Sequence, residues 1–304
     1  MPAALTPREG RIVPAGERLP VDLAACRKIL VVRLDFIGDW VLTLPFFAGL
    51  RRSAPDAEIT VVVLTRVYDL ARSCRYVDRV VAVEPKGEGP LVFGASDEAG
   101  IAAFAADYAG GEFDVTLVPR WDADFNVALR IADGSCARQV IGFSEGCTVT
   151  RAIRNRGHDG FYTAVLLDRG RMHEVEHMLG FLEAIGGDAG IRRAELDLDD
   201  RDRAAARDFL SRTIGTGQPF VAVAPFALGR KGLPLDVTAM LAANLATACR
   251  LPLVVIGSPA HEELASEFIE MLTVPAVSAV GLPLGESAVV IGDATALVGM
   301  DSGP

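Results

Sequence analysis

The sequence lacks long apolar runs and organised cysteines. No stretch approaches the roughly 18 apolar residues of a membrane-spanning helix, and residues 1–27 hold no apolar core of the kind found in signal peptides. The five cysteines are scattered and include no C-x-x-C pair, which argues against a disulfide framework or a zinc knuckle. We therefore expect a cytoplasmic protein, and we expect any contact with the inner face of the cytoplasmic membrane to be peripheral.

Positive charge and phosphate-binding loops are also scarce. The chain has three lysines and a formal net charge of −10, which argues against nucleic acid as a partner. No G-x-G-x-x-G follows a strand candidate and no G-x-x-x-x-G-K-S/T occurs, so dinucleotide-dependent dehydrogenases and P-loop enzymes are excluded. A small anionic ligand is still compatible with the sequence, because a helix N-terminus and one or two cations bind a diphosphate locally.

What the sequence does contain is a regular alternation of short apolar runs and helix-length segments. Strand candidates lie at 28–34, 59–64, 79–83, 115–118, 139–143, 220–224, 253–256, 273–280 and 296–300. Helical patterns occupy 172–185, 200–212 and 236–249. The alternation predicts an α/β fold with two Rossmann-like, doubly wound domains facing a cleft, and ligands in such sheets lie beyond the carboxyl ends of the strands.

Four motifs follow strand candidates in order along the chain. The first, at 33–45, reads R-L-D-F-I-G-D-W-V-L-T-L-P, and the second, at 224–234, reads A-P-F-A-L-G-R-K-G-L-P. The third, at 254–263, reads V-V-I-G-S-P-A-H-E-E, and the fourth, at 298–304, reads V-G-M-D-S-G-P. Together they resemble the family-9 glycosyltransferases, the group that includes the ADP-heptose:lipopolysaccharide heptosyltransferases.

The resemblance implies a GT-B architecture and a reaction. After an N-terminal extension (1–27) we expect an acceptor-side domain (28–165), a helical connector (166–215) and a donor domain (216–304). The family transfers a sugar, here expected to be heptose from ADP-heptose, to a lipid-linked lipopolysaccharide-type glycan, with inversion and without metal or cofactor; we expect a monomer. The fourth motif normally continues to a His, so we expect these 304 residues to be a fragment with an incomplete second domain and little transferase activity.

Two residues match the chemical needs of such a transfer. Asp39, past the end of a strand and near a helix start, would be the base that takes the proton of the acceptor hydroxyl. Lys231 would stabilise the departing diphosphate as a mobile point charge. From the residues alone, Asp39 is also a good helix cap and Lys231 an ordinary surface lysine.

The resemblance also assigns binding residues. On the donor side these are Asp301, Ser302, Gly303, Glu262, Pro225 and Ala227. On the acceptor side they are Gly38, Thr43 and Ser144. Residues 301–303 are alternatively an ordinary β-turn, and Glu262 a solvated acid at a helix start, with Glu263 as the register-shifted alternative.

Three other patterns compete with this interpretation. The run from His173 to His177 satisfies H-E-x-x-H, which makes a zinc-dependent hydrolase the alternative enzyme, although Glu183 replaces the third histidine of the longer motif. Ser144 lies in G-x-S-x-G, but the C-T-V-T-R that follows is a poor start for the helix of a nucleophile elbow. Asp122 and Asp124 are either a metal pair or part of a polar loop after a strand. A catalytically inactive nucleotide-sugar-binding protein is the remaining alternative.

Overall fold

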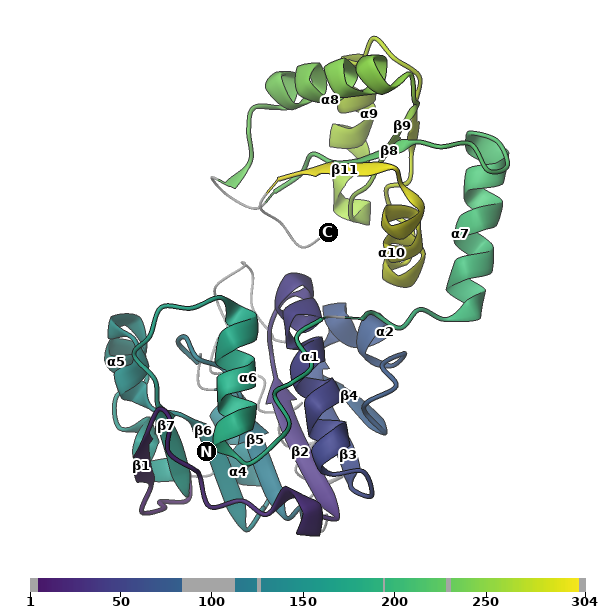
Figure 1. Cartoon of the computed structure of the whole chain (residues 1–304). Coiled ribbons are helices and arrows are strands. Elements are labelled where there is room, and N and C mark those ends of the chain that lie inside the picture. Colours follow the sequence, from purple (N-terminus) through teal and green to yellow (C-terminus); the bar gives the residue numbers. More distant parts are fainter. Residues whose placement is uncertain (1–4, 84–112, 125–126, 194, 228–230, 301–304) are drawn as a thin grey trace. The chain divides into compact units, whose positions relative to one another are not determined.

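The computed structural model describes residues 5–83, 113–124, 127–193, 195–227 and 231–300. The chain divides into two compact units, Met1–Leu196 and Asp197–Pro304, each with a parallel sheet and covering helices (Figure 1). Parallel neighbours require a crossover connection, which the helices supply. The predicted α/β class with two Rossmann-like units is confirmed.

The first unit contains a seven-stranded sheet in the order β1-β7-β6-β5-β2-β3-β4. The strands are β1 (Arg11–Pro14), β2 (Lys28–Arg33), β3 (Glu58–Leu64), β4 (Arg79–Val83), β5 (Val115–Val118), β6 (Gln139–Phe143) and β7 (Ala164–Leu167). The chain starts the main sheet at β2, builds outward through β3 and β4, and returns to the other side of β2 with β5. The gap between the carboxyl ends of β2 and β5 is therefore the point where the strand order reverses, which is where ligands bind in open parallel sheets.

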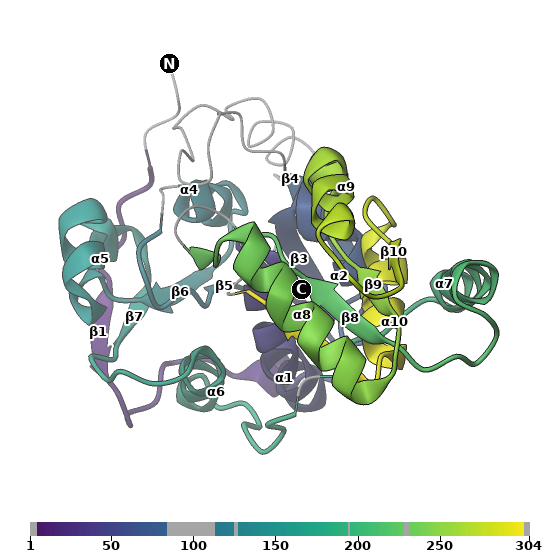
Figure 2. The same cartoon turned by 90° about the horizontal axis from the view of Figure 1, so that it is seen from above.

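Helices cover both faces of this sheet. They are α1 (Ile37–Ser53), α2 (Tyr68–Ala71), α4 (Val127–Gly134), α5 (Val149–Arg154) and α6 (Glu174–Ala184). Figure 2 shows α1 and α6 on one side of the sheet and α4 on the other. The apolar side of α4 packs on Leu30, Val32 and Val118, while the rings of Phe46 and Phe181 meet between α1 and α6 with their centroids 6.4 Å apart.

The second unit repeats this design on a smaller scale. Its sheet has the order β10-β9-β8-β11, with β8 (Val221–Ala224), β9 (Leu253–Val255), β10 (Ala276–Ser278) and β11 (Ala296–Gly299). The helices are α7 (Asp200–Thr213), α8 (Leu235–Cys249), α9 (Glu262–Glu270) and α10 (Leu284–Asp293). Successive residues of β8 point to opposite faces: Val221 and Val223 pack with α8 and α9, whereas Ala222 packs with α7 and α10. Here the strand order reverses between β8 and β11.

Two segments differ from the sequence-based boundaries. The N-terminal extension contributes β1, which pairs in parallel with β7 along Arg11–Pro14. The helices assigned to a connector belong to different units, since α6 packs on α1 in the first and α7 on α10 in the second. A four-residue edge strand has too little apolar pattern to be recognised in the sequence. The periodicity of an amphipathic helix shows which of its faces is apolar but not which element that face packs against.

No helix among the described residues combines the length and apolar character needed to cross a membrane.

The contact between α1 and α6 depends on a glycine. A Cβ added at Gly49 would overlap the Asp188 carbonyl oxygen and lie 2.5 Å from Leu182 Cδ2, because backbone and side chain approach this face of α1 directly. Gly180, inside α6, has no atom of the described chain within 4 Å of the same added Cβ.

Gly49→Ala is therefore expected to lower the free energy of unfolding by about 2 kcal/mol through overpacking, although alanine is the better helix former. The matched variant Gly180→Ala should raise the free energy of unfolding by up to about 1 kcal/mol. Both tryptophans, Trp40 and Trp121, lie in the first unit, so urea unfolding followed by tryptophan fluorescence measures its stability. Equal effects at the two glycines would show that α1 and α6 are not closely packed here.

Candidate active site

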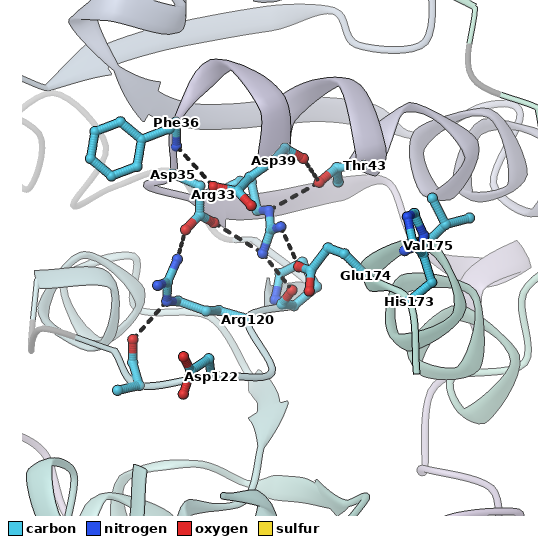
Figure 3. Close-up of polar contacts among 12 residues, drawn as sticks. Arg33, Asp35, Phe36, Asp39, Thr43, Arg120, Asp122, His173, Glu174 and Val175 are labelled. Atoms are coloured by element: carbon cyan, nitrogen blue, oxygen red, sulfur yellow. Dashed lines mark hydrogen bonds and ion pairs between the residues drawn. The ribbon is translucent and has the colours of Figure 1, made fainter. Parts of the chain in front are cut away.

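The carboxyl ends of β2 and β5 bring together charged residues that are far apart in the sequence. Arg33 ends β2, Asp35 follows it, and Arg120 follows β5. Glu174 is the first residue of α6. Figure 3 shows these four side chains converging below the first turn of α1. The cluster lies at the reversal point of the strand order, where the sequence predicts a ligand site.

Arg33 is the centre of the cluster and is 2% exposed. Its guanidinium group has four partners: Nε donates to Thr43 Oγ1 at 3.0 Å, Nη1 donates to the Pro119 carbonyl at 3.0 Å and pairs with Asp35 Oδ2 at 3.0 Å, and Nη2 donates to Glu174 Oε1 at 2.6 Å. A buried guanidinium group is tolerated only when its charge is neutralised and its donors are used. These partners meet both conditions.

Asp35 is as buried as Arg33 and carries a second ion pair, with Arg120. The Arg120 side chain remains about a quarter exposed, with its Nε donating to the Ala123 carbonyl at 2.7 Å. Burial lowers the pKa of Arg120 from its usual value, and the neighbouring positive charge of Arg33 lowers it further. Arg120 is thus the member of the cluster that faces both the buried carboxylate and solvent.

Asp39 is held in the first turn of α1 by two contacts. Its half-buried carboxylate accepts a hydrogen bond from the Phe36 backbone N–H at 3.3 Å, so it does cap the helix start. Its carbonyl oxygen accepts from Thr43 Oγ1 at 2.6 Å, and that same hydroxyl oxygen accepts from Arg33. The structure therefore connects Glu174, Arg33 and Thr43 to the backbone of the predicted base.

Gly38 and Ser144 differ in the space around them. A Cβ added at Gly38 would meet no atom of the described chain within 4 Å, so the helix start is open beside Asp39. Ser144 is buried, and its Oγ donates to Asp159 Oδ2 at 2.6 Å while accepting from the Gly146 N–H at 3.1 Å. These bonds fix the turn after β6, so the described geometry does not present Ser144 as a nucleophile. An acceptor contact for Ser144 stays a prediction.

The three residues of the H-E-x-x-H pattern make separate contacts in the structure. His173 caps α6, accepting from the Val175 N–H at Nδ1, and Glu174 binds Arg33. His177 is buried, with Nδ1 3.1 Å from Asp168 Oδ2 and its ring stacked on Trp121 at 4.1 Å between centroids. Among the described residues no three His, Cys, Asp or Glu side chains are placed to hold a metal ion. Of the pattern, Glu174 alone joins the charge cluster among the described contacts.

Asp122 and Asp124 also have separate partners. Asp124 is buried, and its Oδ2 accepts from the Leu129 N–H at 3.2 Å near the start of α4. Asp122 is exposed, with Oδ1 3.3 Å from Thr148 Oγ1. The polar-loop interpretation fits these contacts.

In the second unit, three of the sequence motifs meet at the reversal point between β8 and β11. Phe226, which follows buried Pro225 after β8, stacks on His261 at 4.6 Å between centroids, which joins the second motif to the third. The Leu233 N–H lies 3.4 Å from Met300 Sδ at the end of β11, which joins the second motif to the fourth. The described donor-side residues Pro225, Ala227, Lys231 and Glu262 therefore come from segments that contact one another.

The individual donor-side predictions are placed as follows. Lys231 is exposed, two residues before Leu233, and Ala227 is half-buried. Glu262 is exposed at the first residue of α9, immediately after His261. Asp301, Ser302 and Gly303 lie outside the described residues. The structure thus positions the loops, while the contacts of each predicted residue with a donor stay predictions.

Comparisons with known proteins agree with this architecture. A family-9 glycosyltransferase from Veillonella parvula DSM 2008 superposes with a TM-score of 0.77 at 22% identity, covering 93% of this chain and 77% of that one. The E. coli heptosyltransferase WaaC, solved with ADP, superposes at 0.68 with 18% identity, over 91% and 82% of the two chains. E. coli ADP-heptose lps heptosyltransferase II gives 0.60 at 17% identity, over 91% and 80%.

Sequence comparison matches a shorter part of the chain than structure comparison does. A Haemophilus influenzae protein named "Putative glycosyltransferase" is 36% identical over 61 residues, which are 20% of this chain and 18% of that protein. No protein-family model matches the chain. The resemblance to family 9 is therefore confirmed in the fold, which this chain shares with solved family-9 glycosyltransferases and heptosyltransferases.

The sequence analysis did not identify Arg33, Asp35 and Glu174 as a cluster. The available signal was charge immediately after a continuously apolar strand, and an acid at a helix start that looked like part of a zinc motif. Only strand order shows that the ends of β2 and β5 are neighbours.

Removal of the Glu174 charge tests whether the cluster is stabilised as described. Glu174→Gln is expected to lower the free energy of unfolding of the first unit by about 2 kcal/mol, because a charged hydrogen bond to a buried guanidinium group is lost. The matched control is Glu176→Gln on the same helix, whose pair with Arg192 is solvent-exposed. That variant should change stability by less than about 0.5 kcal/mol. Tryptophan-detected urea unfolding measures both, and similar losses in the two variants would contradict the structure.

Proposed function

We propose that this chain is a family-9 glycosyltransferase that transfers a sugar from a nucleotide-diphosphate donor to a hydroxyl group of a glycan acceptor, with inversion at the anomeric carbon. The observation that carries the proposal is the carboxylate of Asp39, held beside an open helix start at the reversal point of the first sheet. The fold match over more than nine-tenths of the chain supports it.

Asp39 is the base in this proposal. Its carboxylate takes the proton of the acceptor hydroxyl as the oxygen forms a bond to the anomeric carbon, and the bond from that carbon to the diphosphate oxygen breaks on the opposite side. The electron pair of the broken bond leaves with the diphosphate. Because the Phe36 N–H occupies only part of the capacity of the carboxylate, lone pairs are left for the acceptor hydroxyl.

Lys231 stabilises the leaving diphosphate in this proposal. A diphosphate gains negative charge as it departs, and a lysine ammonium group is a mobile cation that follows it. The loop that carries Lys231 also contains Phe226, which stacks on His261 before α9, and Leu233, whose N–H lies 3.4 Å from Met300 Sδ after β11. Glu262 and residues 301–303 complete the donor side by resemblance to the family.

The identity of the donor sugar and of the acceptor is also a proposal. The E. coli heptosyltransferase WaaC superposes on this chain in two structures, one solved with ADP and one with ADP-2-deoxy-2-fluoro heptose. We propose ADP-heptose as the donor and a lipid-linked, lipopolysaccharide-type glycan as the acceptor. Thermal-shift measurements with a panel of nucleotide sugars test the donor: ADP-heptose should stabilise the protein most, and a larger shift with another nucleotide sugar would replace it.

Asp39→Asn separates the two roles of this residue. The asparagine Oδ1 still accepts from the Phe36 N–H, so the helix cap and the fold should persist. The amide cannot take the acceptor proton, so turnover should fall by at least about a hundredfold. Asp69→Asn, an exposed acid in the first turn of α2, is the control and should retain turnover. Donor binding should be unchanged in both, and undiminished turnover in Asp39→Asn would restrict Asp39 to capping.

Lys231→Ala should lower kcat/KM by about ten- to a hundredfold, the usual effect of losing one charged hydrogen bond. Lys28→Ala serves as the control, because Lys28 is an exposed lysine at the start of β2, away from the carboxyl ends of the strands. Steady-state kinetics at varied donor concentration measure the effect. Equal kinetics for the two variants would show that Lys231 does not act on the donor.

A further inference from the structure

The most exposed large apolar side chains among the described residues lie on α5. Val149 and Ile153 are 79% and 74% exposed, whereas the next in order, Met240, reaches 56%. Val149 and Ile153 are four residues apart and therefore share one face of the helix. Met172, in the loop after β7, is 49% exposed. Large apolar side chains left in water at this level on one helix face indicate an interaction surface.

The loop after β7 adjoins the turn that leads into α5. The Arg169 Nε donates to the Gly146 carbonyl at 3.3 Å, and the Asp168 N–H lies 3.4 Å from Cys147 Sγ. Figures 1 and 2 both show α5 at the same end of the sheet as β7. Residues 168 and 169 thus contact the turn that precedes α5, and residues 170–172 follow them directly in the chain.

This surface is basic in a protein whose net charge is −10. Residues 146–157 and 169–173 contain five arginines and no Asp or Glu. Arg151 is fully buried and donates to the carbonyl oxygens of Arg120, Asp122 and Phe143, so it anchors the helix from below. The other four are exposed: Arg154, Arg156, Arg169 and Arg171. The Asp122 carboxylate, next to Thr148, lies at the margin.

We propose that this surface docks the protein on an anionic lipid bilayer. The docking surface consists of Val149, Ile153, Met172, Arg154, Arg156, Arg169 and Arg171. Apolar side chains between arginines suit the boundary between lipid headgroups and acyl chains. The apolar side chains are buried there, and the arginines meet the lipid phosphates. The acidic remainder of the protein is repelled by such a membrane, so the local arginines decide which face approaches it.

Docking through this surface also places the bilayer near the candidate active site. The turn into α5 follows the carboxyl end of β6, and β6 is two strands from β2 in the sheet, which is about 10 Å. Asp39 follows β2 at the same edge. An acceptor whose lipid anchor stays in the membrane then presents its glycan to Asp39. This consequence rests on the proposed function, whereas the docking itself does not.

Vesicle flotation of the 304-residue chain, without donor or acceptor, tests the proposal. The protein should float with vesicles of phosphatidylcholine containing one-third phosphatidylglycerol and much less with phosphatidylcholine alone. The double variant V149D/I153D should lower the partition coefficient at least about tenfold, because two apolar side chains no longer enter the bilayer. M240D/L241D, two exposed apolar residues of α8, is the matched control and should bind as the unmodified chain does.

The charge contribution is measured separately. R154Q/R156Q should lower partitioning about 25-fold, roughly fivefold for each arginine at an anionic surface, and the difference should shrink with added salt. R201Q/R212Q on α7 is the charge-matched control and should bind normally. Absence of binding to anionic vesicles, or equal losses in the α5 and control variants, overturns the proposal; so does an α5-dependent dimer that forms without vesicles, which would assign the surface to a second copy. Because flotation needs no nucleotide sugar, its outcome is independent of the transferase assays.

Discussion

The arrangement of the first unit depends on the buried guanidinium group of Arg33. A charge at the carboxyl end of a central strand, removed from water, costs several kcal/mol unless opposite charge and acceptors surround it. The chain supplies Asp35 two residues later, a carbonyl after β5 and Glu174 from α6. Each partner comes from a different segment, so satisfying one side chain fixes β2, the loop after β5 and the start of α6 relative to one another.

This fixed geometry extends to the candidate base. Thr43 accepts from Arg33 and donates to the Asp39 carbonyl, so the first turn of α1 is tied to the cluster by backbone as well as by side chain. Buried ion pairs add little net stability compared with apolar packing of similar volume. Here these ion pairs hold a carboxylate at the reversal point of the sheet, and no atom of the described residues lies within 4 Å of a Cβ added at Gly38.

In the described part of the second unit, aromatic and sulfur contacts rather than buried ion pairs hold the loops together. Phe226 stacks on His261, and Leu233 meets Met300, so aromatic and sulfur contacts join the three motifs at the edge of the sheet. Close approach of the Phe226 ring requires the glycine at 257, since a Cβ there would lie 2.9 Å from Phe226 Cδ2.

The sequence by itself determined the α/β class, most strands, the two-unit organisation and the motif positions of Asp39 and Lys231, because buried parallel strands are continuously apolar and local patterns specify local structure. Tertiary structure decided what those patterns could not. It shows β1 as an additional strand and places the two predicted connector helices in different units. It also shows that His173 caps α6, Glu174 pairs with Arg33 and His177 is buried beside Asp168. The ion pairs Asp35–Arg120 and Arg33–Glu174 join residues more than eighty positions apart in the chain, and the order of strands in the sheet brings such residues together.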